Sequence, residues 1–152
     1  MKQIFFIFLI LSGYNSLAGS DPSLQITNAW IQEGPPNARV LAGFMDINNH
    51  TTQGIIIESA TSDSFKRIEF HQTINENGMA RMRKQDKLMI KSGASLKLKH
   101  GGYHLMLIQP KKHLKEGDKI DILFKLSTST TQLISLTVKK PTDSQQGHQH
   151  HH

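Results

Sequence analysis

The chain has 152 residues, a formal net charge of +6 and no cysteine. This length fits one domain with a single hydrophobic core. Without cysteine the chain can form neither a disulfide framework nor a thiolate metal site, so any metal must be bound by His, Met, Asp or Glu. The lysines are spread along the chain and not gathered on one element, which argues against nucleic-acid binding.

Residues 1–18 have the three-part layout of a secretory signal peptide. Lys2 precedes an apolar run at 4–11, and Ser16-Leu17-Ala18 follows with small residues at the positions that cleavage requires. The apolar run is much shorter than the roughly 20 residues that cross a bilayer as a helix. We therefore expect cleavage after Ala18 and an exported, soluble mature protein without membrane insertion. Because no cysteine lies near this point, we expect no lipobox attachment.

Residues 19–140 are predicted to form one β-sandwich domain. From Leu24 onward, short runs with period-two alternation are separated by Gly, Asn, Pro and Asp clusters, which is typical of an antiparallel sandwich or barrel. We expect Trp30, Met45 and Met89 in the core. The predicted strands are 25–32, 40–48, 55–60, 67–72, 80–83, 87–90, 95–98, 104–109, 119–126 and 131–138.

Residues 141–152 are polar and are predicted to be a disordered, His-rich tail. The tail ends in an interrupted cluster, His148, His150, His151 and His152, which is unlike the uninterrupted run of a cloning tag, although a tag is the alternative. Imidazoles on a flexible segment suit copper(II) or nickel better than copper(I). We therefore expect a possible copper(II) site in the tail.

Two His–Met pairs stand out within the predicted strands. His104 and Met106 are two residues apart, so on a strand both side chains leave the same face. His71 and Met82 lie on the two sides of a predicted hairpin around Asn77-Gly78. One register places these two residues directly opposite each other, and a two-residue turn at Asn77-Gly78 makes them diagonal neighbours. Both registers put them on one face.

Convergence of the two pairs would give a site with two imidazoles and two thioethers. Soft thioether sulfur favours copper(I), and the absence of thiolate and carboxylate partners argues against zinc, calcium and magnesium. Met79 should point to the opposite face of the hairpin, as a packing residue. The remaining histidines of the domain, His50, His100 and His113, are expected on the solvated surface, with His100 in a position that could lie near the site.

Three segments closely resemble the periplasmic copper chaperones called PCuAC: 69–71, 78–83 and 101–107. The signature of that family is His, ten residues, Met, twenty-one residues, His, one residue, Met, and the chain meets it at His71, Met82, His104 and Met106. The resemblance extends over most of the mature chain, from Asn28-Ala29-Trp30 to the last predicted strand.

The resemblance implies an all-β, cupredoxin-like antiparallel β-sandwich with Greek-key connections and a surface copper(I) site formed by those four residues. It also implies a periplasmic chaperone that delivers copper to the binuclear copper centre of cytochrome c oxidase. The implied partners are the copper-bearing oxidase subunit and a thiol-bearing copper chaperone. Some members carry a His- and Met-rich tail that binds copper(II), which residues 141–152 resemble in histidine only. We expect a monomer.

Two rival functions stay open at this point. The first is a periplasmic protein of copper sequestration or resistance, with the histidine tail as a metal buffer. The second is a metal-free structural or adhesion sandwich, since a fold does not fix a function. An enzyme is not expected, because the chain has no nucleophile elbow, P-loop or dinucleotide fingerprint.

Overall fold

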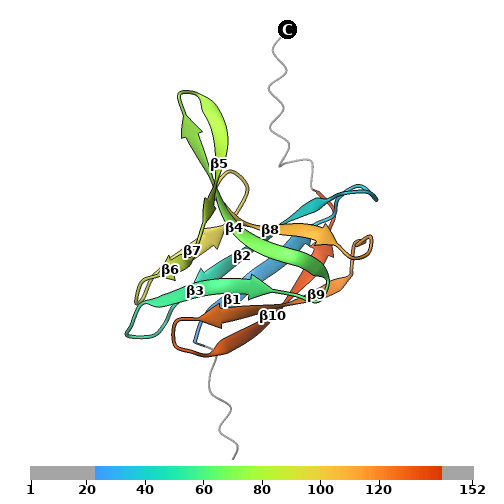
Figure 1. Ribbon diagram of the computed structural model, residues 1–152. Coiled ribbons are helices and arrows are strands. Elements are labelled where there is room, and N and C mark those ends of the chain that lie inside the picture. The colour runs from blue at the N-terminus through green and yellow to red at the C-terminus, as the bar shows by residue number, and fades with distance from the viewer. Residues whose placement is uncertain (1–22, 142–152) are drawn as a thin grey trace, which may run out of the picture.

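The computed structural model describes residues 23–141, which form ten β-strands (Figure 1). The all-β prediction is confirmed, and β1, β2, β7 and β9 begin and end where the sequence predicted. The predicted signal peptide and histidine tail lie outside the described residues. Within residues 23–141 no helix has the length and apolar character needed to cross a membrane. The strands are β1 (Gln25–Gln32), β2 (Val40–Asn48), β3 (Ile55–Thr61), β4 (Phe65–Glu76), β5 (Met79–Gln85), β6 (Leu88–Ile90), β7 (Ser95–Leu98), β8 (Tyr103–Pro110), β9 (Lys119–Leu126) and β10 (Thr131–Lys139).

The strands form a continuous hydrogen-bonded order that folds over into two layers. The order is β5-β4-β8-β7-β2-β1-β10-β9-β3-β6, and β8 also pairs with β2. Neighbours are antiparallel except at β1–β10 and at the short β7–β8 contact. Phe70 of β4 packs edge-on against Phe124 of β9 with ring centres 6.4 Å apart, although these strands are distant in the order. The layer containing β1, β2, β4 and β8 therefore covers the layer containing β3, β9 and β10 (Figure 1).

The core between the layers follows from the period-two pattern. In β9 every second residue is buried and the intervening residues are exposed, because successive side chains of a strand point to opposite faces. Met45 is buried as predicted. The prediction for Met89 is wrong: it is 59% exposed, because it is the middle residue of the three-residue β6, whose outer two residues face the core. Trp30, predicted as a core anchor, is only partly buried.

A two-stranded ribbon projects from the sandwich. Strand β8 accompanies β4 only as far as the pair Gln72–Tyr103, whereas β5 continues to pair with β4 up to Glu76–Met79. The far halves of β4 and β5 therefore leave the body together (Figure 1). The ribbon closes through Asn77 and Gly78, whose φ angles of 54° and 78° fit a type I′ turn. This confirms the two-residue turn among the two predicted registers.

Candidate metal centre

The four predicted ligand residues leave the same outer face of the first layer. The β4–β8 register pairs His71 with His104 and places Met106 two residues along the same face from His104. The β4–β5 register pairs Thr73 with Met82, so Met82 is a diagonal neighbour of His71. The predicted clustering on one face is therefore present in the backbone, at the base of the projecting ribbon.

The two imidazoles lie close together and at different depths. Their ring centres are 6.1 Å apart with an interplanar angle of 33°. Each metal–nitrogen bond is about 2 Å long, so two rings at this separation can flank one ion. His104 is only 7% exposed and His71 and Met106 are partly buried, whereas Met82 is 63% exposed. The face is thus closed on the side of the sheet and open on the side of the ribbon.

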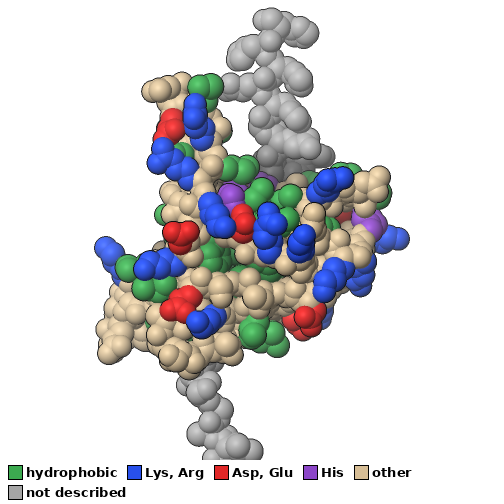
Figure 2. Space-filling model, in the orientation of Figure 1, with side chains coloured by type: hydrophobic (Ala, Val, Ile, Leu, Met, Phe, Trp, Pro, Cys, Tyr) green, Lys and Arg blue, Asp and Glu red, His purple; other side chains and the backbone are tan. Residues whose placement is uncertain are grey.

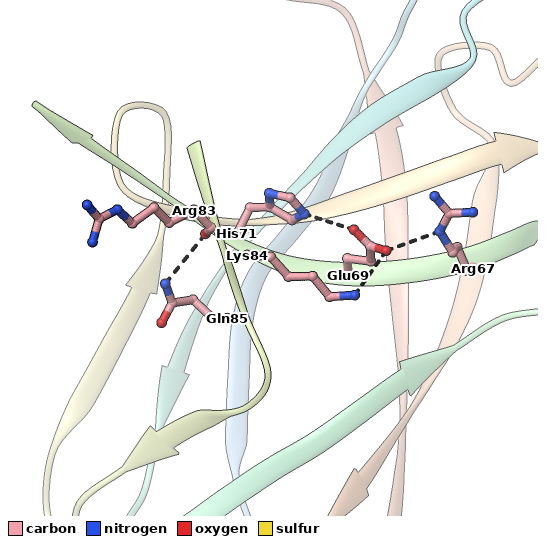
Figure 3. A network of polar contacts seen from close by, with 6 residues as sticks. All are labelled: Arg67, Glu69, His71, Arg83, Lys84 and Gln85. Carbon is pink, nitrogen blue, oxygen red and sulfur yellow. Dashed lines mark hydrogen bonds and ion pairs between the residues drawn. The ribbon is translucent and has the colours of Figure 1, made fainter. Parts of the chain in front are cut away.

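Glu69 fixes the ring of His71, as Figure 3 shows. The Glu69 carboxylate accepts a hydrogen bond from His71 Nε2 at 2.9 Å and also contacts Arg67 and Lys84 at 3.1 and 3.2 Å. The bond from His71, together with those from Lys84 and Arg67, outweighs partial burial and lowers the pKa of Glu69 to about 2. Because the carboxylate is ionised and can only accept, the proton of a neutral His71 ring stays on Nε2. Its Nδ1 therefore carries a free lone pair.

That Nδ1 atom is buried and has no hydrogen-bond partner within the described residues. A buried polar atom without a partner costs free energy, and such orphans in folded proteins point to a ligand or ion. A neutral imidazole nitrogen held in place by a carboxylate on its other nitrogen is the usual arrangement of a metal-bound histidine. This residue therefore fits a metal ion.

A tight turn orients His104 in the same way. The Gly102 carbonyl accepts hydrogen bonds from His104 Nδ1 at 3.1 Å and from the Thr73 amide at 3.0 Å. The turn depends on Gly101, whose φ of 71° is rarely adopted by other residues, as the paired glycines predicted. Burial lowers the pKa of His104, the bond to Gly102 opposes this, and the nearby His71 and His100 reinforce it. A neutral ring with its proton on Nδ1 leaves Nε2 available as a ligand.

The remaining candidates are not part of this pair. Met79 faces the opposite side of the ribbon as predicted, but it is 57% exposed, so its assignment as a packing residue is wrong. His50, His100 and His113 are exposed as predicted. The role of Glu69 was missed by sequence reasoning, although its i, i+2 spacing from His71 was a usable signal.

The fold and this His–Met face define a class of protein: a cupredoxin-like β-sandwich domain of the PCuAC type. The copper-bound PCuAC domain from PmoF2 superposes with a TM-score of 0.67 at 15% identity, covering 79% of this chain and 95% of that one. The solution structure of copper(I)-bound DR1885 from Deinococcus radiodurans superposes with a TM-score of 0.67 at 28% identity, covering 84% and 85% of the two chains.

A family model described as "Putative lipoprotein LpqE-like" matches residues 24–138, and the chain belongs to this family. A putative lipoprotein of Leifsonia xyli subsp. xyli is 29% identical over 117 residues, which are 76% of this chain and 69% of the relative. An uncharacterized protein of Rickettsia prowazekii is 31% identical over 98 residues, 64% of this chain and 54% of that protein. Membership of a putative-lipoprotein family supports export to the cell envelope.

Proposed function

We propose that this chain is a periplasmic copper(I) chaperone that binds one ion with His71, Met82, His104 and Met106. The observation that carries the proposal is the pair of preoriented imidazoles on the face that also presents the two thioethers. Two soft sulfur donors select copper(I) over the harder divalent ions. The copper-bound state of DR1885 and of the PmoF2 domain supports the same cargo for this fold.

The open side of the site suits transfer by ligand exchange. Met82 is the most exposed of the four residues and comes from the ribbon, whereas His104 is held in the sheet. An acceptor protein can therefore reach the ion from the side of Met82 without opening the core. We propose the binuclear copper centre of cytochrome c oxidase as the destination, reached directly or through a thiol-bearing chaperone. Nothing in this role requires an enzymatic step.

Ligand counting tests the site itself. The His104→Ala/Met106→Ala double variant should lose tight copper(I) binding in competition with a chromogenic copper(I) chelator, while its far-UV circular dichroism stays that of a folded β-protein. X-ray absorption of the loaded wild-type protein should show two sulfur and two nitrogen ligands. Unchanged binding by the folded double variant would refute the proposed site.

Gene deletion separates delivery from sequestration. Loss of cytochrome c oxidase activity at low copper, with normal copper tolerance, is expected for a delivery protein. Copper sensitivity with normal oxidase activity would instead identify a sequestering protein. Truncation after Pro141 tests the tail: we expect it to remove copper(II) binding by His148, His150, His151 and His152 and to leave copper(I) binding unchanged.

A further inference from the structure

A pocket of about 370 Å³ lies against β1, β2 and the end of β7, and none of the four candidate ligands lines it. Aromatic rings of Trp30, Phe44 and His100 line it. The rings of Phe44 and His100 lie 4.1 Å apart between centres, and the Trp30 centre is 4.9 Å from that of Phe44 and 6.2 Å from that of His100. His100 was expected on the solvated surface, and it is exposed, but its ring is held against this aromatic wall.

The strand register places this wall on the same outer face as His104. Gly43 of β2 pairs with Leu105 of β8. The β2–β8 pairing ends there, and β2 pairs with β7 from Met45 onward. Phe44 and His104 are the next residues on the two strands, and their side chains leave the outer face. His100 packs against Phe44 with its ring tilted by 37°, and it lies near enough to His104 to lower the pKa of that ring, so it is the imidazole next to the candidate site. In Figure 2 histidine side chains lie at the base of the projecting ribbon, and another lies apart from them at the right of the view.

The turn that carries His100 is the one that orients His104. It runs from Lys99 to Tyr103, and the Lys99 amide donates a hydrogen bond to the Tyr103 carbonyl at 2.7 Å. It also contains the Gly102 carbonyl, which accepts the hydrogen bond from His104 Nδ1. His100 is exposed, and within residues 23–141 its ring nitrogens make no hydrogen bond to another residue, so they are available to a metal. No three His, Asp or Glu side chains of residues 23–141 are grouped to hold one ion together. His100 is thus adjacent to the site but separate from it.

We propose that His100 is an accessory ligand that holds copper(I) at the mouth of the pocket while the ion enters or leaves the main site. The proposal rests on the proposed copper function. In this step a bond from copper to His100 forms as one bond to a resting ligand breaks, the ion stays copper(I), and no electron is transferred. An extra imidazole at the rim lowers the barrier to exchange without adding to the affinity of the resting site, because it binds only during transit.

The test compares His100→Ala with His113→Ala, because His113 is also exposed and lines a separate pocket near Pro110. Equilibrium affinity is measured by chelator competition, and transfer of copper(I) from the loaded protein to excess bathocuproine disulfonate by stopped flow. We expect the His100→Ala variant to keep the wild-type affinity and to transfer copper about tenfold more slowly, the effect of one lost interaction in the transition state. His113→Ala should match wild type, and His100→Met, which keeps a soft donor, should restore fast transfer.

The single tryptophan of the chain supplies a second readout. Since Trp30 lies 6.2 Å from His100, an ion held by His100 should transiently quench its fluorescence, and the transient should vanish in His100→Ala. An unchanged transfer rate would overturn the proposal. A lowered equilibrium affinity would also overturn it, because His100 would then belong to the resting ligand set. A wild-type protein that binds no copper(I) at all would reject the proposed function instead, so the two failures are distinct.

Discussion

Replacing Glu69 by Gln tests whether the carboxylate that is hydrogen-bonded to His71 raises the copper(I) affinity of the site. The substitution keeps the size of the side chain but removes its negative charge. That charge strengthens the hydrogen bond from His71 Nε2 and pairs with Arg67 and Lys84. A hydrogen bond to a charged group contributes about 1.5–3 kcal/mol and a neutral one about 0.5–1.5 kcal/mol. The difference, roughly 1–1.5 kcal/mol, corresponds to about a tenfold weaker copper(I) affinity.

Competition with bicinchoninate measures this change. Glu76→Gln is the matched control, because Glu76 lies on the same strand and contacts Arg81 and Arg83 but pairs with Met79 at the end of the ribbon. Glu69→Ala should weaken binding further, toward the hundredfold limit seen when a metal-bound histidine loses its carboxylate partner. If Glu69→Gln and Glu76→Gln bind copper(I) equally well, Glu69 does not orient the ligand.

Three further outcomes follow from the geometry. Met82→Ala should weaken copper(I) binding by at least about tenfold, whereas Met79→Ala, on the opposite face and similarly exposed, should not; equal effects in the competition assay would contradict the strand register. In the metal-free protein, the lowered pKa of Glu69 stabilises the fold fully above pH 4.5, its ordinary pKa, and this contribution disappears as the pH falls toward about 2. The stability difference between wild type and Glu69→Gln, from urea unfolding at several pH values, should therefore shrink across that window, and a constant difference would speak against the ion pair. Gly101→Ala should lower the free energy of unfolding by about 1–2 kcal/mol, because its φ is positive although a Cβ atom there meets nothing within 4 Å. Gly102→Ala is the control, because a Cβ atom there makes only ordinary van der Waals contacts and no positive φ is involved. An equal loss of stability in both variants would show that the positive φ of Gly101 is not its cause.

The strands were predictable wherever one face is buried and the run is long. β9 alternates strictly, and β2 presents a near-continuous apolar inner face, so their bounds follow from the period-two pattern. β5 was predicted too short, at 80–83 instead of Met79–Gln85, because its exposed charged residues carry no burial signal. In the three-residue β6 the pattern is too brief to fix which side faces the core, and Met89 was misplaced for that reason.

The candidate site was predictable as a set of residues on one face, but not as an arrangement of atoms. Spacing places His104 with Met106, and the Asn77-Gly78 turn selects the diagonal placement of Met82. Which nitrogen of His71 is free depends on the Glu69 carboxylate. The contact of His100 with Phe44 depends on β2 and β7, which are adjacent only in the folded sheet. Periodicity within one strand contains no information about such neighbours.

Strand β5 is an edge strand of the sheet, and it carries a thioether that the proposed function needs in contact with solvent. A bare sheet edge with exposed methionines invites pairing with a second copy and, from there, aggregation. Arg81 and Arg83 interrupt this strand with positive charge, which makes such pairing repulsive. Neutralising those side chains should therefore appear first as a loss of solubility at high protein concentration, well before any change in metal content.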